Sequence, residues 1–326
     1  MSYFNIKGRL RIRQGFTLIE LLVVIVIIGI LASLILVGGS AARRIVRQGL
    51  IKTEIAGIDM AIETYRRAHG EYPPDFSDEA AVMRHVRKRW TNYNPASFAA
   101  FCADIKAGST FEDSDGKWYA WDFTNGKGAH MSALAFWLGG MPEQSTGMLG
   151  GFSADVSAPM DVISSSQRET PIMELTLGGN YRFYIIEENA GTKADPHLVL
   201  PAIVSYELPI VYFKASTAGN YLQTGAGDPK HFHIHGNIFL DELGCVAPYA
   251  KSGATAADAV WHNPKSFQLI HPGVIDKVFS APHGTDHGHS HYHAIDPGKD
   301  VRLGLTLEDN DNQANFGGNT IETGGN

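Results

Sequence analysis

The feature that most constrains this chain is an apolar run of 22 residues near its N-terminus, from Phe16 to Val37. A helix rises about 1.5 Å per residue, so this run would span roughly 30 Å, the thickness of the hydrocarbon core of a bilayer. The run contains one charged residue, Glu20. It predicts a membrane-spanning helix or the core of a targeting signal, and the carboxylate needs an explanation.

Three interpretations of this run compete. A secretory signal peptide could be cut among the small residues 38–42, although the apolar core of such signals is only about 7–15 residues long. A plain membrane anchor would have four basic residues on each side, so charge does not set its orientation. Neither accounts for Glu20, because a carboxylate at the centre of a bilayer costs about 2.5–3.5 kcal/mol. The flanking basic residues are Lys7, Arg9, Arg11 and Arg13 before the run and Arg43, Arg44, Arg47 and Lys52 after it.

The third interpretation rests on the string Gly15-Phe16-Thr17-Leu18-Ile19-Glu20, which follows the basic leader. It resembles the cleavage and methylation motif of type IV prepilins and type II secretion pseudopilins. The resemblance implies that prepilin peptidase cuts between Gly15 and Phe16, that Phe16 becomes N-methylated, and that the apolar helix remains as the anchor. It also implies that Glu20 pairs with the N-terminal amine of a neighbouring subunit, since a buried acid and a buried amine can neutralise each other.

The helical pattern continues beyond the apolar run. Five large residues recur at spacings of four and three, which places them on one face of a helix. Gly70 and the pair Pro73-Pro74 then end the pattern. We expect one helix from Phe16 to about His69, with an amphipathic second half and an ion pair between Glu63 and Arg67 on its exposed side. The repeated residues are Ile51, Ile55, Ile58, Ile62 and Tyr65.

The expected fold class is α+β, with a long N-terminal helix packed on an antiparallel sheet, a helical insertion and long loops. The resemblance implies a pilin-like fold, and the Gly70-Glu-Tyr-Pro turn is similar to that of major-type (G-like) pseudopilins. The expected divisions are a leader (1–15), a transmembrane and assembly helix (16–38), its amphipathic continuation (39–70) and a periplasmic domain (71–326). Within this domain we expect a mostly helical insertion at about 77–150 and a strand-rich part at 170–316.

Individual elements can be predicted from local patterns. Helices are expected at 78–90, 97–105 and 131–138, and the group Trp118-Tyr119-Ala120-Trp121 is interpreted as packing. Strands are expected where β-branched and aromatic residues alternate, with a hairpin turn at 178–180. The expected strands are 173–177, 181–187, 203–206, 210–214, 234–240 and 267–271.

Charge and motif content limit the possible functions. The formal net charge is −7, and loss of the four basic leader residues would leave −11. An acidic mature chain argues against nucleic acid as a partner. No hydrolase, phosphate-binding or metalloprotease motif is present, so no catalytic residue is predicted and an enzyme is not expected. The two cysteines, Cys102 and Cys245, could form a disulfide or be two separate buried thiols.

Two histidine clusters and an acidic segment are candidate metal ligands, although no cofactor is required by the interpretation above. Imidazole suits transition metals, but a polar, solvated tract with incidental affinity is the alternative. Near the C-terminus, 267–273 and 308–316 resemble the entrance and exit of the calcium loop of major pseudopilins, which implies calcium ligands there. The intervening stretch departs from that pattern. The candidates are His231, His233, His235, His287, His289 and His291 for a transition metal, and Asp309 and Asp311 for calcium.

Three functions follow from these observations. The first is a structural subunit of a type II secretion pseudopilus, anchored by one span in the inner membrane with its domain in the periplasm. Its partners would be prepilin peptidase, other pilin or pseudopilin subunits and the inner-membrane assembly platform. The second is a surface type IV pilin or minor pilin with an adhesive or metal-binding head. The third is a membrane-anchored periplasmic metal-binding protein or enzyme that uses the histidines.

Overall fold

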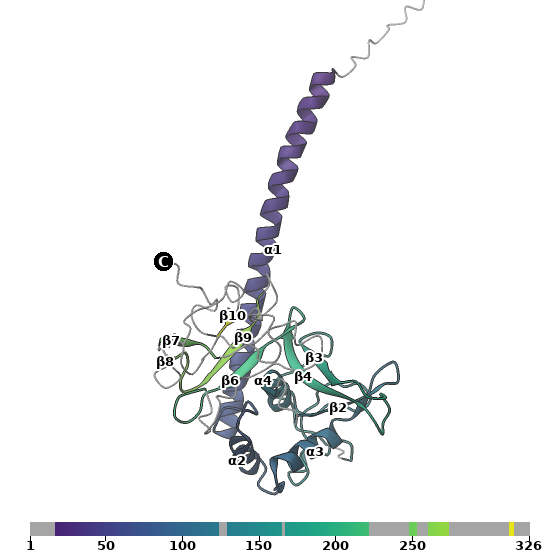
Figure 1. The fold of residues 1–326 in the computed structure, drawn as a ribbon, viewed down its shortest axis with the longest axis vertical. Coiled ribbons are helices and arrows are strands. Elements are labelled where there is room, and N and C mark those ends of the chain that lie inside the picture. Colours follow the sequence, from purple (N-terminus) through teal and green to yellow (C-terminus); the bar gives the residue numbers. More distant parts are fainter. Residues whose placement is uncertain are drawn as a thin grey trace, which may run out of the picture. The chain divides into compact units, whose positions relative to one another are not determined.

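The computed structural model describes residues 17–123, 129–164, 167–221, 248–252, 260–273 and 313–315, without the side chains of 34–41, 129, 250–252 and 313. The chain divides into two compact units, Met1–Arg47 and Gln48–Asn326. The first helix, α1 (Leu18–His69), supplies the described part of unit 1 and the first element of unit 2 (Figure 1). The helix ends at His69, as predicted, and the chain turns at Gly70, where φ is +81°.

In unit 2, α1 buries the predicted apolar face. Ile51 and Ile62 are fully buried, and Ile55 and Ile58 are each 1% exposed. Tyr65 is also fully buried at the end of this face. The predicted ion pair of Glu63 with Arg67 is wrong, because the carboxylate of Glu63 pairs with Arg66 instead, at 2.8 Å. Tyr72 Oη also donates to it at 2.7 Å, so Glu63 joins the helix to the turn that follows.

Three further helical segments surround this core. The helix α2 (Glu79–Arg89) begins at Asp78, whose side chain accepts from Ala81 N, and α3 (Phe98–Gly108) begins at Ser97 in the same way. The helix α4 (Ala129–Leu134) continues directly into a π-helical turn, η1 (Ala135–Gly139). The structure confirms all three predicted helices, with ends displaced by a few residues.

The larger sheet has the order β1-β2-β4-β3, with β5 also paired to β4. Its longest pair, β3 and β4, is antiparallel, and both strands are labelled in Figure 1. The pairing of β2 with β4 is parallel, which corrects the expectation of a purely antiparallel sheet. Between these two strands the chain passes through α4, η1 and β3, and this long crossover allows the parallel arrangement. The strands are β1 (Phe111–Glu112), β2 (Trp118–Trp121), β3 (Tyr181–Glu187), β4 (His197–Ser205) and β5 (Leu208–Pro209).

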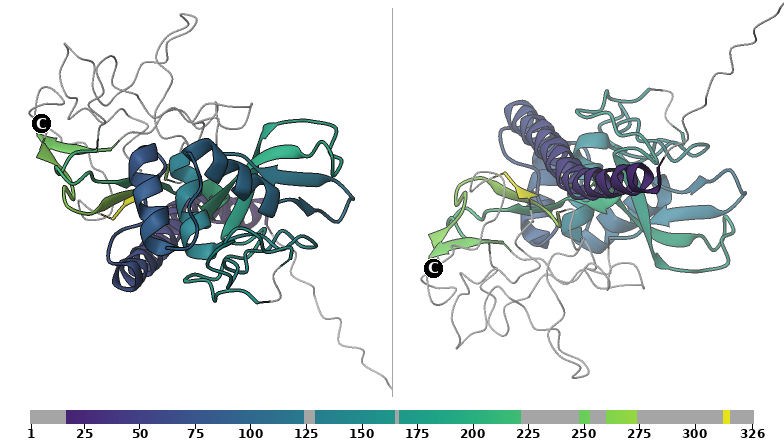
Figure 2. Two further views of the ribbon diagram at one scale, coloured as in Figure 1. Left: turned by 90° about the horizontal axis from the view of Figure 1, so that it is seen from below. Right: turned by 90° about the horizontal axis from the view of Figure 1, so that it is seen from above.

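A smaller sheet has the order β10-β9-β6, and β7 pairs with β8. β9 pairs antiparallel with β6 on one side and with β10 on the other, and β10 (yellow) lies beside β9 (light green) in Figure 2. The strands are β6 (Val211–Lys214), β7 (Ala250–Ser252), β8 (Val260–Trp261), β9 (Phe267–His271) and β10 (Gln313–Ala314).

Several strand predictions are confirmed and others need correction. The bounds of β3 and β9 are those predicted, β6 covers most of 210–214, and 203–206 is the end of the longer β4. The prediction for 173–177 is wrong, because this segment is irregular and only Leu177 forms an isolated bridge. The insertion at 77–150 is less helical than expected, since it contains β1 and β2. The predicted strand 234–240 lies outside the described residues.

Candidate assembly site and the core that supports it

Glu20 lies in the first turn of α1 and is exposed in unit 1. Its Oε2 accepts from the backbone N of Thr17 at 2.8 Å and from Thr17 Oγ1 at 2.7 Å. Glu20 N donates in return to Thr17 Oγ1 at 3.3 Å. This reciprocal arrangement is a capping box, which satisfies backbone N–H groups at the start of a helix. The spacing of Thr17 and Glu20 is its sequence signature, and our sequence analysis missed it.

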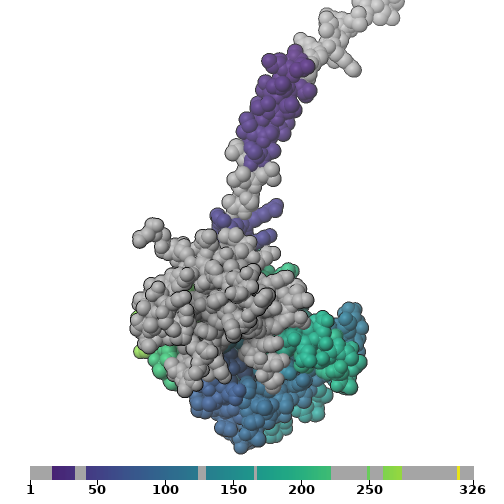
Figure 3. Space-filling model, in the orientation of Figure 1, coloured from purple at the N-terminus to yellow at the C-terminus, as the bar shows by residue number. Residues whose placement is uncertain are grey.

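The apolar part of α1 that follows is open to solvent in unit 1 (Figure 3). The large side chains between Leu18 and Leu31 range from 45% exposed at Val24 to 81% exposed at Leu18. Within the part of the chain that the structure describes, no helix is both long and apolar enough to cross a membrane.

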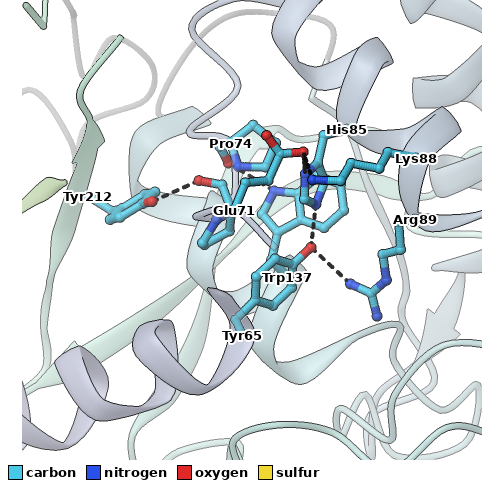
Figure 4. A network of polar contacts seen from close by, with 9 residues as sticks. Tyr65, Glu71, Pro74, His85, Lys88, Arg89, Trp137 and Tyr212 are labelled. Carbon is cyan, nitrogen blue, oxygen red and sulfur yellow. Dashed lines mark hydrogen bonds and ion pairs between the residues drawn. The ribbon is translucent and has the colours of Figure 1, made fainter. Parts of the chain in front are cut away.

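A buried polar network fixes the turn after α1 (Figure 4). Tyr65 Oη lies 2.6 Å from His85 Nε2, and His85 Nδ1 lies 2.8 Å from a carboxylate oxygen of Glu71. Lys88 approaches the same oxygen at 3.6 Å. Burial lowers the pKa of His85 to about 4, against the opposing contact with Glu71, so the ring is neutral at pH 7. Neutral His85 links the end of α1 to α2.

The carbonyl groups of Pro73 and Pro74 are held from two other elements. Trp137 Nε1, on η1, donates to Pro74 O at 2.9 Å, and Tyr212 Oη, on β6, donates to Pro73 O at 2.7 Å. The predicted Gly70-Glu-Tyr-Pro turn is therefore anchored at consecutive residues (Figure 4). These two bonds satisfy carbonyl groups of buried residues, which would be costly to leave unpaired.

Arg89 occupies a largely apolar space beside this network. Its guanidinium donates to Tyr65 Oη at 3.1 Å and to Glu169 at 3.2 Å, and its side chain is 6% exposed. The guanidinium carbon lies 4.5 Å from the ring centres of Trp90 and Phe152. The buried charge is thus compensated by one carboxylate and by cation–π contacts. One residue of the basic end of α2 is therefore buried.

Asp75, at the end of the same turn, is a second buried charge. Its carboxylate accepts from Ser77 N at 3.1 Å and from Lys214 N at 2.8 Å, and it lies 3.6 Å from His130 Nδ1. Burial alone would raise the pKa of Asp75, but these partners lower it below its ordinary value. The carboxylate joins the turn to β6 and α4.

The other predicted site residues are not brought together by what the structure describes. Cys102 is a free, buried thiol, and burial raises its pKa to about 12. Among the described residues, no group of three or more histidine, cysteine, aspartate or glutamate side chains could hold a metal ion. The remaining predicted residues lie outside the described ranges: Gly15, Phe16, His231, His233, His235, Cys245, His287, His289, His291, Asp309 and Asp311.

Comparison with known proteins identifies the N-terminal region. Residues 10–36 match the prokaryotic N-terminal methylation motif. This match supports the resemblance of the N-terminal region to that of type IV pilin-like proteins. It is similar to type II secretion system core protein G of Vibrio cholerae serotype O1, with 31% identity over 91 residues. The match covers 28% of this chain and 62% of that relative. No solved structure matches the chain.

Proposed function

We propose that this chain is a structural, non-enzymatic subunit of a type II secretion pseudopilus. Prepilin peptidase would cut it between Gly15 and Phe16, and it would assemble from the inner membrane with other subunits through the assembly platform. The observation that carries this proposal is the match to the methylation motif at residues 10–36, a range that contains the predicted cleavage site and Glu20. Similarity to core protein G, named as a component of that secretion system, supports the choice of system.

The exposed surface of α1 in unit 1 supports assembly. Uncovered side chains such as Leu18, Ile25 and Ile28 are 58–81% exposed, and a continuous apolar surface of this kind is unfavourable in water. We propose that lipid covers it before assembly and that the helices of neighbouring subunits cover it afterwards.

In unit 2, α1 has an uncharged face opposite its buried stripe. Met60 is 71% exposed on this face, and a Cβ added at Gly49 or Gly57 would meet no atom within 4 Å. Small residues let helix backbones approach closely. We propose that this face, defined by Gly49, Thr53, Gly57, Met60 and Thr64, also receives a helix of a neighbouring subunit.

Glu20 would change partner during assembly. In the described chain its carboxylate bonds to Thr17, one residue from the predicted new N-terminus. A methylated amine from another subunit would offer a full positive charge in place of these neutral donors, and a charged donor forms the stronger bond.

Processing is tested by intact mass and N-terminal sequencing of protein made in cells that contain prepilin peptidase. A mature chain that begins at N-methylated Phe16 is the expected result. Cleavage near Ala41, or no cleavage, would contradict the proposed class.

Assembly is tested by Glu20→Ala, with Glu54→Ala as the matched control because Glu54 is also an exposed acid on α1. We expect Glu20→Ala to be processed and inserted normally but to be absent from filaments, whereas Glu54→Ala should be incorporated normally. Normal filaments from Glu20→Ala would remove the role assigned to this residue. Loss of protein secretion on deletion of the chain would favour a pseudopilus, and loss of a surface filament alone would favour a pilus.

A further inference from the structure

His271, the last residue of β9, is fully buried, and both of its ring nitrogens have backbone partners. Nε2 lies 2.9 Å from the carbonyl oxygen of Ser205, at the end of β4. Nδ1 accepts from the backbone N–H of Gly273 at 3.0 Å. A carbonyl oxygen can only accept and a backbone N–H can only donate, so the ring must be neutral, with its hydrogen on Nε2.

Among the residues that the structure describes, no charged side chain raises the pKa of this ring. Three described residues bond to or pair with His271: Ser205 of β4, Gln313 of β10 and Gly273 of the turn. None of these three residues is ionisable. Burial lowers the pKa of His271 from 6.5 to about 4, against a raising effect of the Ser205 carbonyl, and no charged side chain contributes.

A proton on Nδ1 would change one contact and leave the other. Nε2–H could still donate to Ser205, but Nδ1–H would face the N–H of Gly273, so two donors would oppose each other in a buried place. Gly273 has φ +82°, a left-handed conformation in a turn that this hydrogen bond helps to hold. Protonation of His271 would therefore destabilise this turn.

His85 is also a buried histidine, but its hydrogen-bond partners differ in kind from those of His271. Its ring faces a carboxylate of Glu71 and the hydroxyl of Tyr65. A hydroxyl oxygen can accept as well as donate, so protonated His85 could keep both partners. Protonation in place is therefore compatible with the contacts of His85 and incompatible with those of His271.

We infer that His271 is an acid-operated latch: its neutral ring holds the turn at Pro272–Gly273 against the end of β9, and a proton on Nδ1 releases that turn. The latch acts where β9 meets β10, because His271 pairs with Gln313 and Ile270 with Ala314. Release would loosen this end of the smaller sheet while the network around Tyr65 and His85 stays closed. The inference does not depend on assembly into a filament.

Hydrogen–deuterium exchange of the full chain in detergent, followed by mass spectrometry, tests the latch. Labelling times are scaled to the intrinsic exchange rate at each pH. In the closed state the ring has a pKa of about 4, and in the open state it would have its ordinary value of 6.5. Linkage then predicts that the equilibrium constant for local opening of the segment 267–273 rises about 70-fold between pH 7.5 and 4.5.

Two variants separate this effect from general acid unfolding. His271→Gln should make exchange in 267–273 independent of pH over this range, whereas His85→Gln should leave the acid dependence of that segment unchanged. Persistence of the dependence in His271→Gln, or its loss in His85→Gln, would overturn the latch. If His271→Gln does not fold, exchange at the imidazole C2 position of the unmodified chain measures the titration of His271 directly. A value near 6.5 in the folded chain would also overturn it.

Discussion

The hydroxyl group of Tyr65, near the end of α1, lies 2.6 Å from Nε2 of His85 on α2. The two residues are twenty positions apart, and their contact joins the first helix of unit 2 to the next element of the chain. Because Tyr65 also accepts from Arg89, its oxygen is shared by two side chains of α2. This single atom is therefore a junction between two helices.

Replacing Tyr65 with phenylalanine should destabilise unit 2. The change keeps the ring and leaves Nε2 of His85 and a guanidinium N–H of Arg89 without their partner in a buried place, at a cost of about 1–3 kcal/mol. Tyr72→Phe is the matched control, since that hydroxyl is only partly buried and contacts Glu63 near the surface. Thermal unfolding in detergent, followed by near-UV circular dichroism, measures both. Equal loss in the two variants would contradict the importance of the buried network.

Two residues on opposite faces of α1 should differ sharply in their sensitivity to truncation. Ile58 is 1% exposed and Met60 is 71% exposed. Ile58→Ala should cost about 2–5 kcal/mol because it removes buried atoms and leaves a cavity. Met60→Ala should stay within about 0.5 kcal/mol in unassembled protein. Denaturant unfolding checks this difference, and a large loss from Met60→Ala would show that its face is already covered.

Stability should fall as the pH is lowered from 6.5 toward 4. The pKa of His85 is about 4 in the folded chain and 6.5 ordinarily, so between these values the unfolded chain binds more protons. The stabilisation is complete above pH 6.5 and is lost as the pH falls, with a slope of up to about 1.4 kcal/mol per pH unit for each such histidine. Melting temperatures measured from pH 7.5 to 4.5 check the slope. His85→Gln should reduce it, and an unchanged slope would exclude this contribution.

The calcium expectation for Asp309 and Asp311 stays a prediction. These residues directly precede β10, whose pairing with β9 is part of the smaller sheet. If calcium binds there, it should raise the melting temperature relative to a chelator, because a ligand that binds only the folded chain stabilises it. The double variant Asp309→Asn, Asp311→Asn should abolish the shift. A calcium shift that persists in the double variant would place the ligands elsewhere.

Periodicity in the sequence was sufficient for the parts of the fold that depend on local order. The stripe from Ile51 to Tyr65 predicted which face of α1 is buried, because a regular helix converts spacing directly into a face. Alternation likewise located β3 and β9. Glu20 was found by its offset within a motif, which requires no knowledge of tertiary structure.

Contacts between distant segments could not be predicted in this way. The parallel pairing of Tyr119 with His197 depends on how the chain returns after η1, and no local pattern encodes it. The Asp113 carboxylate accepts from the backbone N of Lys117 at 2.9 Å and also from Tyr119 Oη, and it thereby joins the end of β1 to β2. From the sequence, the aromatic residues at 118–121 are interpreted only as packing. The partners of His85 and His271 were missed for the same reason. The capping box at Thr17 was the exception, since its signal was present in the sequence.

The antiparallel pairing of His271 with Gln313 places Asn315, just after β10, beside both β9 and α1. The side chain of Asn315 accepts from Leu269 N on β9 at 3.0 Å and donates to Asp59 on α1 at 3.1 Å. One amide group thus links the smaller sheet to the first helix of unit 2, so a substitution at Asn315 would disturb both elements.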